Sequence, residues 1–472
     1  MSSRKNRSVA PDTAPHKKVR THVAPKRRFR IPRWLGVGVA LVGVASISAV
    51  GGAYLALSLG STPLLQNELS QDEADAFNQD DPITSSGNLQ LPGLTRPVNI
   101  LVLGMKVLTT DVDNPPPGTE DLGYHALVNS FDGLSDTMLL VRFNPHTNQM
   151  VVLSIPRDTR TWVAGELTKL NEANYYGGPA MAARSVSDLL GGVGIDRYVR
   201  INVQGVEKLV DALGGVTVDV PKDMRYQDDS QHLYINLKAG EQELNGDQAL
   251  QFLRFRYDNN GDIGRIQRQQ MLMRAIIEQS LNPATITRLP KILSVIQSNV
   301  DTNLSVEELL ALTGFAAQTN RSNVQMLMLP GDFSSPSEFE LSYWLPSLRQ
   351  IDQMVAEYFS YGSQQVSASE DPSYLRIAVQ DSTGDPVAVD ELFNVLNESG
   401  YRNVYLDDDW HHELPITRIV AQQGDQASAA TLQRFLGVGE VRVESTGVLN
   451  SDITIQLGRD WLQEYGTSSS LY

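Results

Sequence analysis

Short apolar runs alternate with amphipathic stretches through the middle of the chain. The runs NILVLG (99–104), TMLLVRFN (137–144) and QMVVLSIP (149–156) have the length and composition of buried strands. The last two runs are separated only by the four residues from Pro145 to Asn148, a spacing that predicts a β-hairpin. A long polar segment, 106–135, follows the first run, and polar insertions of this length are often functional.

Helix-like and strand-like patterns then alternate as far as residue 331. Amphipathic stretches predict helices at 180–191, 206–215, 264–281, 287–297 and 305–318. Apolar runs predict strands at 198–203, 216–221 and 326–331. This alternation indicates a layered α/β domain, which we place at 96–360.

Beyond a Ser- and Gln-rich linker at 361–371, the alternation starts again. LRIAVQD, NVYLDD, TRIVAQQ, VRVES and DITIQLG predict strands, with helical stretches at 387–400 and 425–437. The pattern predicts a small C-terminal α/β domain over 372–465, built from two βαβ-like halves. His411 and His412 are its most conspicuous polar pair, and we interpret them as part of a surface loop.

An apolar stretch near the start of the chain, 35–59, contains 25 nearly continuous apolar or small residues and no charge. About 20 such residues span a bilayer as a helix, whereas a cleaved signal peptide has an apolar region of about 7–15 residues. We therefore expect a retained transmembrane anchor at 34–60. The basic tail at 1–33 precedes it, so the positive-inside rule places the tail in the cytoplasm and the bulk of the chain outside. An acidic linker with several prolines, 61–95, is expected to hold the folded part away from the membrane.

Charge is divided unevenly along the chain. Residues 1–34 hold eleven of the 39 Lys and Arg residues and one of the 55 Asp and Glu residues, a net charge of +10. The rest of the chain holds 28 basic and 54 acidic residues, a net charge of −26. This acidic body would repel a phosphate backbone, which excludes general nucleic-acid binding. The sequence contains no cysteine, which excludes disulfides, a thiol nucleophile and a Cys-based metal site.

The predicted hairpin brings an acid and an arginine together. If its loop centres between His146 and Thr147, residues whose numbers sum to 293 lie opposite each other, as Asp136 and Arg157 do. Their Cβ atoms would be about 5 Å apart at one end of the sheet, where α/β proteins place ligands. A structural ion pair is an equally good interpretation of this pair taken alone.

The segment 253–270 is unusually rich in arginine for an acidic protein. It holds four arginines and two carboxylates that suit an anionic ligand: Arg254, Arg256, Arg265, Arg268, Asp258 and Asp262. Arg265, Arg268 and Gln269 have the spacing of one helix face, near a helix N-terminus that itself attracts anions. Arg254 and Arg256 would share a face if the chain were extended there. A solvated charged surface is the alternative interpretation.

Acids and arginines at the ends of predicted elements are the parts of a metal-assisted phosphoryl site. Asp158 and Arg160 directly follow Arg157 in the sequence IPRDTR and form a second charged cluster. Carboxylates suit a hard cation, and arginines stabilise the charge that develops on phosphate oxygens.

These motifs together resemble those of the LytR-CpsA-Psr (LCP) family, in order and approximate spacing. They are NILVLG, LSDTMLLVRFNP, VVLSIPRDTR, KLNEANYYGG, VDALGGVTVDVP, LNGDQALQFLRFRYD and GDIGRIQRQQ, within about 96–330. Residues 372–460 resemble the LytR C-terminal domain that often follows. The resemblance implies an α/β/α sandwich with a mixed central sheet and a deep apolar pocket for a polyisoprenyl chain.

The resemblance also implies an activity. LCP proteins transfer glycopolymers from undecaprenyl-pyrophosphate carriers to peptidoglycan, usually with Mg²⁺, and form a phosphodiester. We therefore expect a membrane-anchored phosphotransferase whose partners are a polyprenyl-pyrophosphate-linked glycan, peptidoglycan and the membrane, with no nucleic acid. A polyprenyl (pyro)phosphate hydrolase and a non-catalytic, lipid-phosphate-binding scaffold of the cell wall stay open as alternatives.

Carried over residue by residue, the family motifs assign roles along the chain. Asp136 is expected to be a Mg²⁺ ligand, and Arg157 to contact the pyrophosphate. Asp262 is expected to activate the acceptor hydroxyl, and Arg265 to act beside it. The resemblance implies further pyrophosphate contacts from six side chains: Arg160, Lys169, Arg254, Arg256, Arg268 and Gln269.

One position departs from the family pattern. The family often carries an acid after the first strand, in LGTD or LGxD, as a second metal ligand, whereas here the strand ends LGMK. Lys106 at that position would oppose Mg²⁺ and could itself contact a phosphate. An acid of the following segment, Asp111, Asp113 or Asp132, is the expected substitute, and we assign Asp132 as the second ligand.

Overall fold

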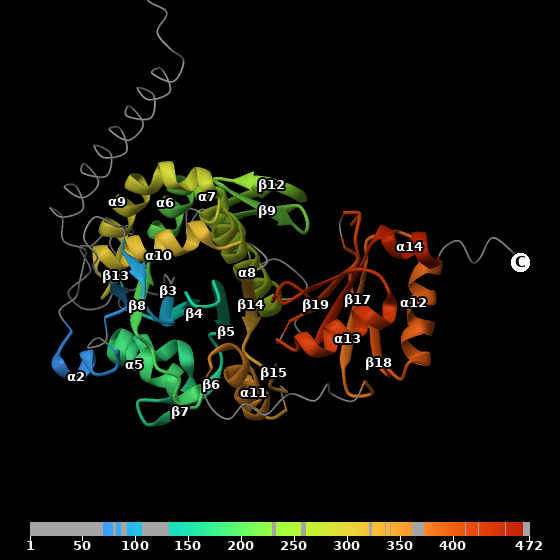
Figure 1. Ribbon diagram of the computed structural model, residues 1–472, viewed down its shortest axis with the longest axis horizontal. Coiled ribbons are helices and arrows are strands. Elements are labelled where there is room, and N and C mark those ends of the chain that lie inside the picture. Colours follow the sequence, from blue (N-terminus) through green and yellow to red (C-terminus); the bar gives the residue numbers. More distant parts are fainter. Residues whose placement is uncertain are drawn as a thin grey trace, which may run out of the picture. The chain divides into compact units, whose positions relative to one another are not determined.

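The computed structural model describes most of the chain beyond residue 68 (Figure 1). The described ranges are 69–78, 82–85, 92–105, 131, 133–228, 233–255, 261–320, 323–335, 337–339, 341–360, 372–410, 412–422, 424–448 and 450–465. The expected basic tail and membrane anchor lie outside these ranges, as do the second linker and His411. Within them, no helix has the length and apolar character needed to cross a bilayer.

A six-stranded mixed sheet forms the centre of the first α/β domain. Its strand order is β13-β8-β3-β4-β5-β14. The strands are β3 (Val98–Met105), β4 (Ser135–Asn144), β5 (Gln149–Ile155), β8 (Arg197–Ile201), β13 (Val300–Thr302) and β14 (Val324–Met328). β3 pairs parallel with β8, and β5 pairs parallel with β14, whereas the other neighbours are antiparallel. The strands predicted from the apolar runs at 99–104, 137–144, 149–156, 198–203 and 326–331 are confirmed.

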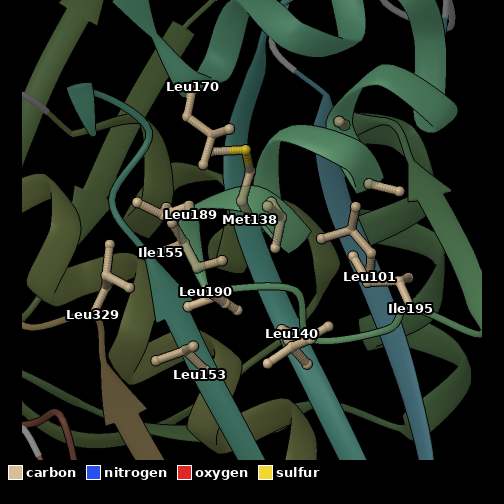
Figure 2. Packing of buried hydrophobic residues seen from close by; sticks show 14 of the residues in the cluster. Leu101, Met138, Leu140, Leu153, Ile155, Leu170, Leu189, Leu190, Ile195 and Leu329 are labelled. Atoms are coloured by element: carbon tan, nitrogen blue, oxygen red, sulfur yellow. The ribbon is translucent and has the colours of Figure 1, made fainter. Parts of the chain in front are cut away.

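Helices cover both faces of this sheet. On one face, alternate residues of β3 and β4 such as Leu101 and Met138 pack with Leu189 of α5 (Ala173–Leu189) (Figure 2). α11 (Leu348–Tyr358) packs into the same cluster. On the other face, Leu139 packs in a cluster with Phe315 of α10 (Val306–Gln318) and with α8 (Gly261–Ser280). Because both faces are buried, the strands are apolar at nearly every position rather than at every second one.

Most of the remaining elements of the domain lie between these strands in sequence, and β15 and β16 follow the last of them. The helices are α6 (Val203–Leu213), α7 (Gly246–Arg254) and α9 (Leu289–Asn299), with short 3₁₀ turns η1 (Leu170–Glu172) and η2 (Pro283–Arg288). Four antiparallel hairpin-like pairs are β6 (Arg160–Val163) with β7 (Glu166–Lys169), β9 (Val216–Val220) with β12 (Gly240–Leu244), β10 (Met224–Asp228) with β11 (Leu233–Leu237), and β15 (Gly331–Phe333) with β16 (Trp344–Pro346). The predicted helices at 180–191, 206–215, 264–281, 287–297 and 305–318 are all present.

Part of the segment expected to be a linker, 61–95, belongs to the folded domain. It contains the short helix α2 (Gln71–Ala74) and the paired strands β1 (Thr84–Ser85) and β2 (Gly93–Leu94). Phe77 is 4% exposed and packs on the Tyr198 ring at a centroid distance of 5.2 Å, and Ile83 is fully buried. The expectation of a spacer is therefore corrected for these residues, because their apolar side chains are part of the core.

The C-terminal α/β domain has the two predicted halves. β17 (Arg376–Asp381) is followed by α12 (Pro386–Glu398) and the parallel strand β18 (Asn403–Leu406). β19 (Arg418–Ala421) is followed by α13 (Gln426–Leu436) and the parallel strand β20 (Glu440–Arg442). The strand β21 (Ile453–Leu457) joins the halves in the order β18-β17-β21-β19-β20, and α14 (Arg459–Tyr465) ends the described chain.

Candidate functional site

The β4–β5 hairpin has the register predicted from its loop. Met138 pairs with Ile155 and Asn144 with Gln149, so paired residue numbers sum to 293. Asp136 lies on β4 and Arg157 follows the end of β5 by two residues, which brings their side chains together. Arg157 Nη1 donates to Asp136 Oδ1 at 2.5 Å, and both side chains are partly exposed. The predicted convergence of the acid and the arginine is confirmed.

A second carboxylate, Asp158, holds two cations of the site. Arg157 Nε donates to Asp158 Oδ2 at 3.3 Å, and Lys169 Nζ donates to Asp158 Oδ1 at 2.9 Å. The backbone fixes this arrangement, since the amide of Asn171 donates to the carbonyl of Arg157. Asp158 is next to Arg157 in the sequence, but its contact with Lys169 forms because the chain turns back at Asn171 to the carbonyl of Arg157.

The β6–β7 pair places Arg160 beside Lys169, because their Cα atoms are register partners. The Arg160 guanidinium lies 5.0 Å from the ring centre of Phe339 and 5.8 Å from that of Tyr343. Lys169 Nζ lies 5.5 Å from the centre of the Tyr343 ring. These aromatic faces stabilise the cations. Sequence reasoning missed both rings, since they lie about 170 residues further along the chain and belong to no motif.

The arginine-rich segment is divided between two places in the fold. Arg254 lies in the last turn of α7 and not in an extended stretch. The extended conformation in which Arg254 and Arg256 would share a face is therefore absent at this residue. Arg268 is buried, donates from Nη2 to the carbonyl of Phe255 at 2.6 Å, and lines a cavity with Gln267 and Met271. Gln269 lines a different cavity, which is the one beside Asp136.

Several predicted site residues are described in part or not at all. Asp262 and Arg265 lie in the first turns of α8, where only the backbone is described. The other predicted residues fall outside the described ranges: Lys106, Asp111, Asp113, Asp132 and Arg256. β3 ends at Met105, which pairs with Ser135, so Lys106 follows it directly along the chain.

A narrow cavity of about 20 Å³ opens beside the Asp136–Arg157 pair. It runs between the sheet and α8, with Gln269, Gln270 and Met273 on the helix side. The sheet contributes mainly apolar side chains: Met138, Leu139, Val152, Ile155, Met326 and Leu327. A charged pair and apolar side chains thus line the same cavity, whose volume in this structure is that of about one water molecule.

Two described carboxylates lie at this site, Asp136 and Asp158, and both are in ion pairs. In the part of the chain that the structure describes, no group of three or more His, Asp or Glu side chains could hold a metal ion. Asp136 is bonded to Arg157, and Asp158 is bonded to both Arg157 and Lys169. Mg²⁺ is commonly held by one or two carboxylates together with substrate phosphates and water, and Asp136 fits that pattern.

Two family descriptions match the two folded parts of the chain. Residues 64–360 match the LytR_cpsA_psr family, and residues 374–461 match the domain described as LytR cell envelope-related transcriptional attenuator. The first match covers the sheet, both helical layers and the candidate site.

Curated relatives carry transferase names. The polyisoprenyl-teichoic acid–peptidoglycan teichoic acid transferase TagU of Bacillus cereus is 31% identical over 324 residues, covering 66% of this chain and 93% of the relative. TagV of Bacillus subtilis, with the same activity in its name, is 32% identical over 240 residues, covering 48% of this chain and 61% of the relative. The crystal structure of B. subtilis TagV is 28% identical, with a TM-score of 0.46 over 57% of this chain and 99% of that chain.

Proposed function

The chain belongs to the LytR-CpsA-Psr family, and from this membership we propose that it is a phosphotransferase that moves a glycopolymer from a polyprenyl-pyrophosphate carrier to peptidoglycan. The observation that carries the proposal is the Asp136–Arg157 pair, which shares a cavity with apolar side chains. The guanidinium matches an anionic pyrophosphate, and the cavity would widen to admit the hydrocarbon chain of the carrier. The names of the TagU and TagV relatives support the same class of substrates.

Arg157 is held in a fixed position by two carboxylates, which suits it to bind the pyrophosphate. Its guanidinium has five N–H donors, of which Nη1 contacts Asp136 and Nε contacts Asp158. Asp158 fixes the plane of the guanidinium, whose positive charge attracts phosphate oxygens. Lys169, held by the same carboxylate, adds a second positive charge. Donors fixed in this way stabilise the charge that develops on the phosphoryl oxygens during transfer.

The proposed reaction breaks a phosphoanhydride bond and forms a phosphodiester. The acceptor hydroxyl oxygen of peptidoglycan attacks the phosphorus next to the glycan, and the bond from that phosphorus to the bridging oxygen breaks. Polyprenyl phosphate leaves, and the hydroxyl proton passes to Asp262; Arg265 is the other catalytic residue that we propose on this helix. The proposed pyrophosphate contacts in addition to Arg157 are Lys106, Arg160, Lys169, Arg254, Arg256 and Gln269. Arg268 is not among them, because it lines a different cavity.

We propose that Mg²⁺ takes part, held by Asp136 and by Asp132. When bound, it would neutralise part of the pyrophosphate charge. We expect EDTA to lower the transfer rate and added Mg²⁺ to restore it in the native protein. The Asp136→Asn variant should not recover with Mg²⁺. A rate that EDTA leaves unchanged would contradict this part of the proposal.

The transferase activity is tested with the full chain in detergent micelles. The substrates are a polyprenyl-pyrophosphate-linked oligosaccharide and peptidoglycan fragments, and the product is measured as glycan bound to peptidoglycan. We expect Arg157→Ala and Asp136→Ala to lower the rate by about 100-fold or more, as does the loss of one positioned electrostatic group in other enzymes. Arg225→Ala is the control, because the Arg225 side chain is 68% exposed on β10.

The outcomes separate the proposal from its alternatives. Glycan on peptidoglycan supports transfer, and phosphate release without it supports a hydrolase. Tight binding of the lipid substrate with neither product supports a scaffold. Equal rates for the Arg157 and Arg225 variants would show that the site is assigned wrongly even if transfer occurs.

We also propose that the chain is a single-pass membrane protein with its N-terminus in the cytoplasm. The support is the sequence pattern at 1–60, where a basic tail precedes 25 nearly continuous apolar or small residues. The full chain should sediment with membranes after an alkaline wash, whereas a chain beginning at residue 61 should stay in the supernatant. Release of the full chain by the wash would contradict the anchor.

A further inference from the structure

Gln270 of α8 is a buried polar side chain without a hydrogen-bond partner among the residues that the structure describes. Only 4% of the surface of this residue is exposed. Neither Nε2 nor Oε1 of its amide has a hydrogen-bond partner in the described part of the chain. Burying an amide costs free energy unless its donors and acceptor are bonded. An amide left in this state is therefore expected to meet a ligand or a water.

The position of Gln270 shows which ligand could reach it. It lines the same narrow cavity as Asp136 and Arg157, together with apolar side chains such as Met273 and Met326. The present cavity volume of about 20 Å³ accommodates about one water molecule. A ligand bound beside Asp136 and Arg157 that widens this cavity would displace that water and meet the amide.

We propose that Gln270 is a specificity-determining residue that recognises the phosphate on the lipid side of the carrier pyrophosphate. Its amide N–H groups donate to an oxygen of that phosphate, while Arg157 holds the phosphate on the glycan side. A hydrocarbon has no hydrogen-bond acceptor, so an isoprenoid without a phosphate leaves the amide unbonded. Polar sites of this kind discriminate strongly against ligands that lack the matching group. The inference rests on the proposed polyprenyl-pyrophosphate substrate and identifies a residue that recognises its pyrophosphate.

The test compares ligands with and without the pyrophosphate. Farnesyl pyrophosphate and farnesol are titrated into the full chain in detergent, and binding is measured by calorimetry. Gln270→Met keeps the length and volume of the side chain but removes its hydrogen bonds. We expect it to bind farnesyl pyrophosphate about 10- to 100-fold more weakly, the usual effect of losing a hydrogen bond to a charged group, with the farnesol affinity unchanged.

Two further variants keep the test decisive. Gln267→Met is the matched control, since Gln267 is half-buried on the same helix but does not line this cavity, and it should leave both affinities unchanged. Gln270→Glu keeps the shape and should repel the phosphate selectively. The ligand-free melting temperature of Gln270→Met should rise, because an unbonded amide is replaced by an apolar group.

Equal losses for farnesyl pyrophosphate and farnesol would assign Gln270 a purely structural role, as would a fall in melting temperature with unchanged selectivity. Native protein that binds neither compound, or that binds both equally, would also reject it. Because binding is measured without turnover, selective binding that depends on Gln270 in a protein without transferase activity would leave this inference standing and reject the proposed function.

Discussion

At the scale of single residues, the cations of the site are held before any substrate arrives. Arg157 is bonded to two carboxylates, and Lys169 is bonded to Asp158 and lies near the Tyr343 ring. Arg160 is stabilised by the same ring. Each side chain has thus already lost much of its rotamer freedom on folding, so binding an anion costs less conformational entropy. Such preorganisation is what electrostatic catalysis requires.

Glu207 of α6 carries a prediction about pH. Burial raises the pKa of its carboxyl group, and repulsion from Asp247 and Asp211 raises it further. A carboxyl whose pKa is higher in the folded state binds its proton more tightly there, so the free energy of unfolding falls as pH rises through that pKa. We expect Glu207→Gln to melt above the native protein at pH 7, with a difference that shrinks toward about pH 4.

Thermal melting between pH 4 and pH 8 checks this prediction. The exposed Glu166 of β7 provides the matched control as Glu166→Gln. A stabilisation by Glu207→Gln that is constant across this range, or that grows as the pH falls, would contradict the stated origin of the effect.

At the scale of elements, a residue that caps a helix can also fix that helix to the sheet. α10 begins with a capping box in which Glu308 Oε2 accepts from the amide of Ser305 at 2.8 Å. Its other oxygen, Oε1, accepts from Arg197 of β8 at 2.7 Å in a buried ion pair. One carboxylate thus defines the start of the helix and fixes it to the central sheet.

Two glycines in helices should respond in opposite directions to alanine. A Cβ at Gly246, the first residue of α7, would lie far inside van der Waals contact with the carbonyl of Glu207 on α6. A Cβ at Gly314, inside α10, would meet nothing within 4 Å. We expect Gly246→Ala to lower the free energy of unfolding by about 1–3 kcal/mol, and Gly314→Ala to raise it by about 0.5–1 kcal/mol.

Urea denaturation of the two variants beside the native protein measures both effects, each serving as the control for the other. An unchanged free energy of unfolding for Gly246→Ala would contradict the prediction, because it would mean that the backbones of α6 and α7 move apart here at little cost.

At the scale of the whole molecule, the first domain is larger than its motifs suggest. Phe77 and Ile83 precede the first strand of the central sheet, yet both are buried in its cores. The backbone supports them, since the amide of Asn78 donates to the carbonyl of Ile195 and that of Thr95 to the carbonyl of Ile83. The folded region therefore begins before residue 96.

Removal of this segment should destabilise the domain. We expect a chain beginning at residue 96 to melt well below one beginning at residue 61, because it exposes the surfaces that Phe77 and Ile83 cover. Phe77→Ala in the longer chain should cost about 3–5 kcal/mol, as for other buried phenylalanines. Equal melting temperatures for the two chains would show that the segment contributes no stability.

Prediction from sequence succeeded where a pattern is local. The apolar runs identified the strands of the central sheet, and the helical periodicity located α5, α6, α8, α9 and α10 to within a few residues, apart from the earlier start of α5. It failed where packing overrides the pattern. Arg254 ends a helix, so the extended conformation that would place it on one face with Arg256 does not hold there, and polar residues around Phe77 concealed a buried segment.

The sequence alone determined the β4–β5 hairpin and, through its short loop, the meeting of Asp136 with Arg157. A tight turn fixes strand register, and register fixes which side chains face each other. Only the tertiary structure decided that Phe339 and Tyr343 stabilise Arg160 and Lys169, and that Gln270 is buried with its amide beside the same cavity. Those contacts join segments about 100 residues or more apart, whose meeting depends on how the helices pack on the sheet and on no local pattern.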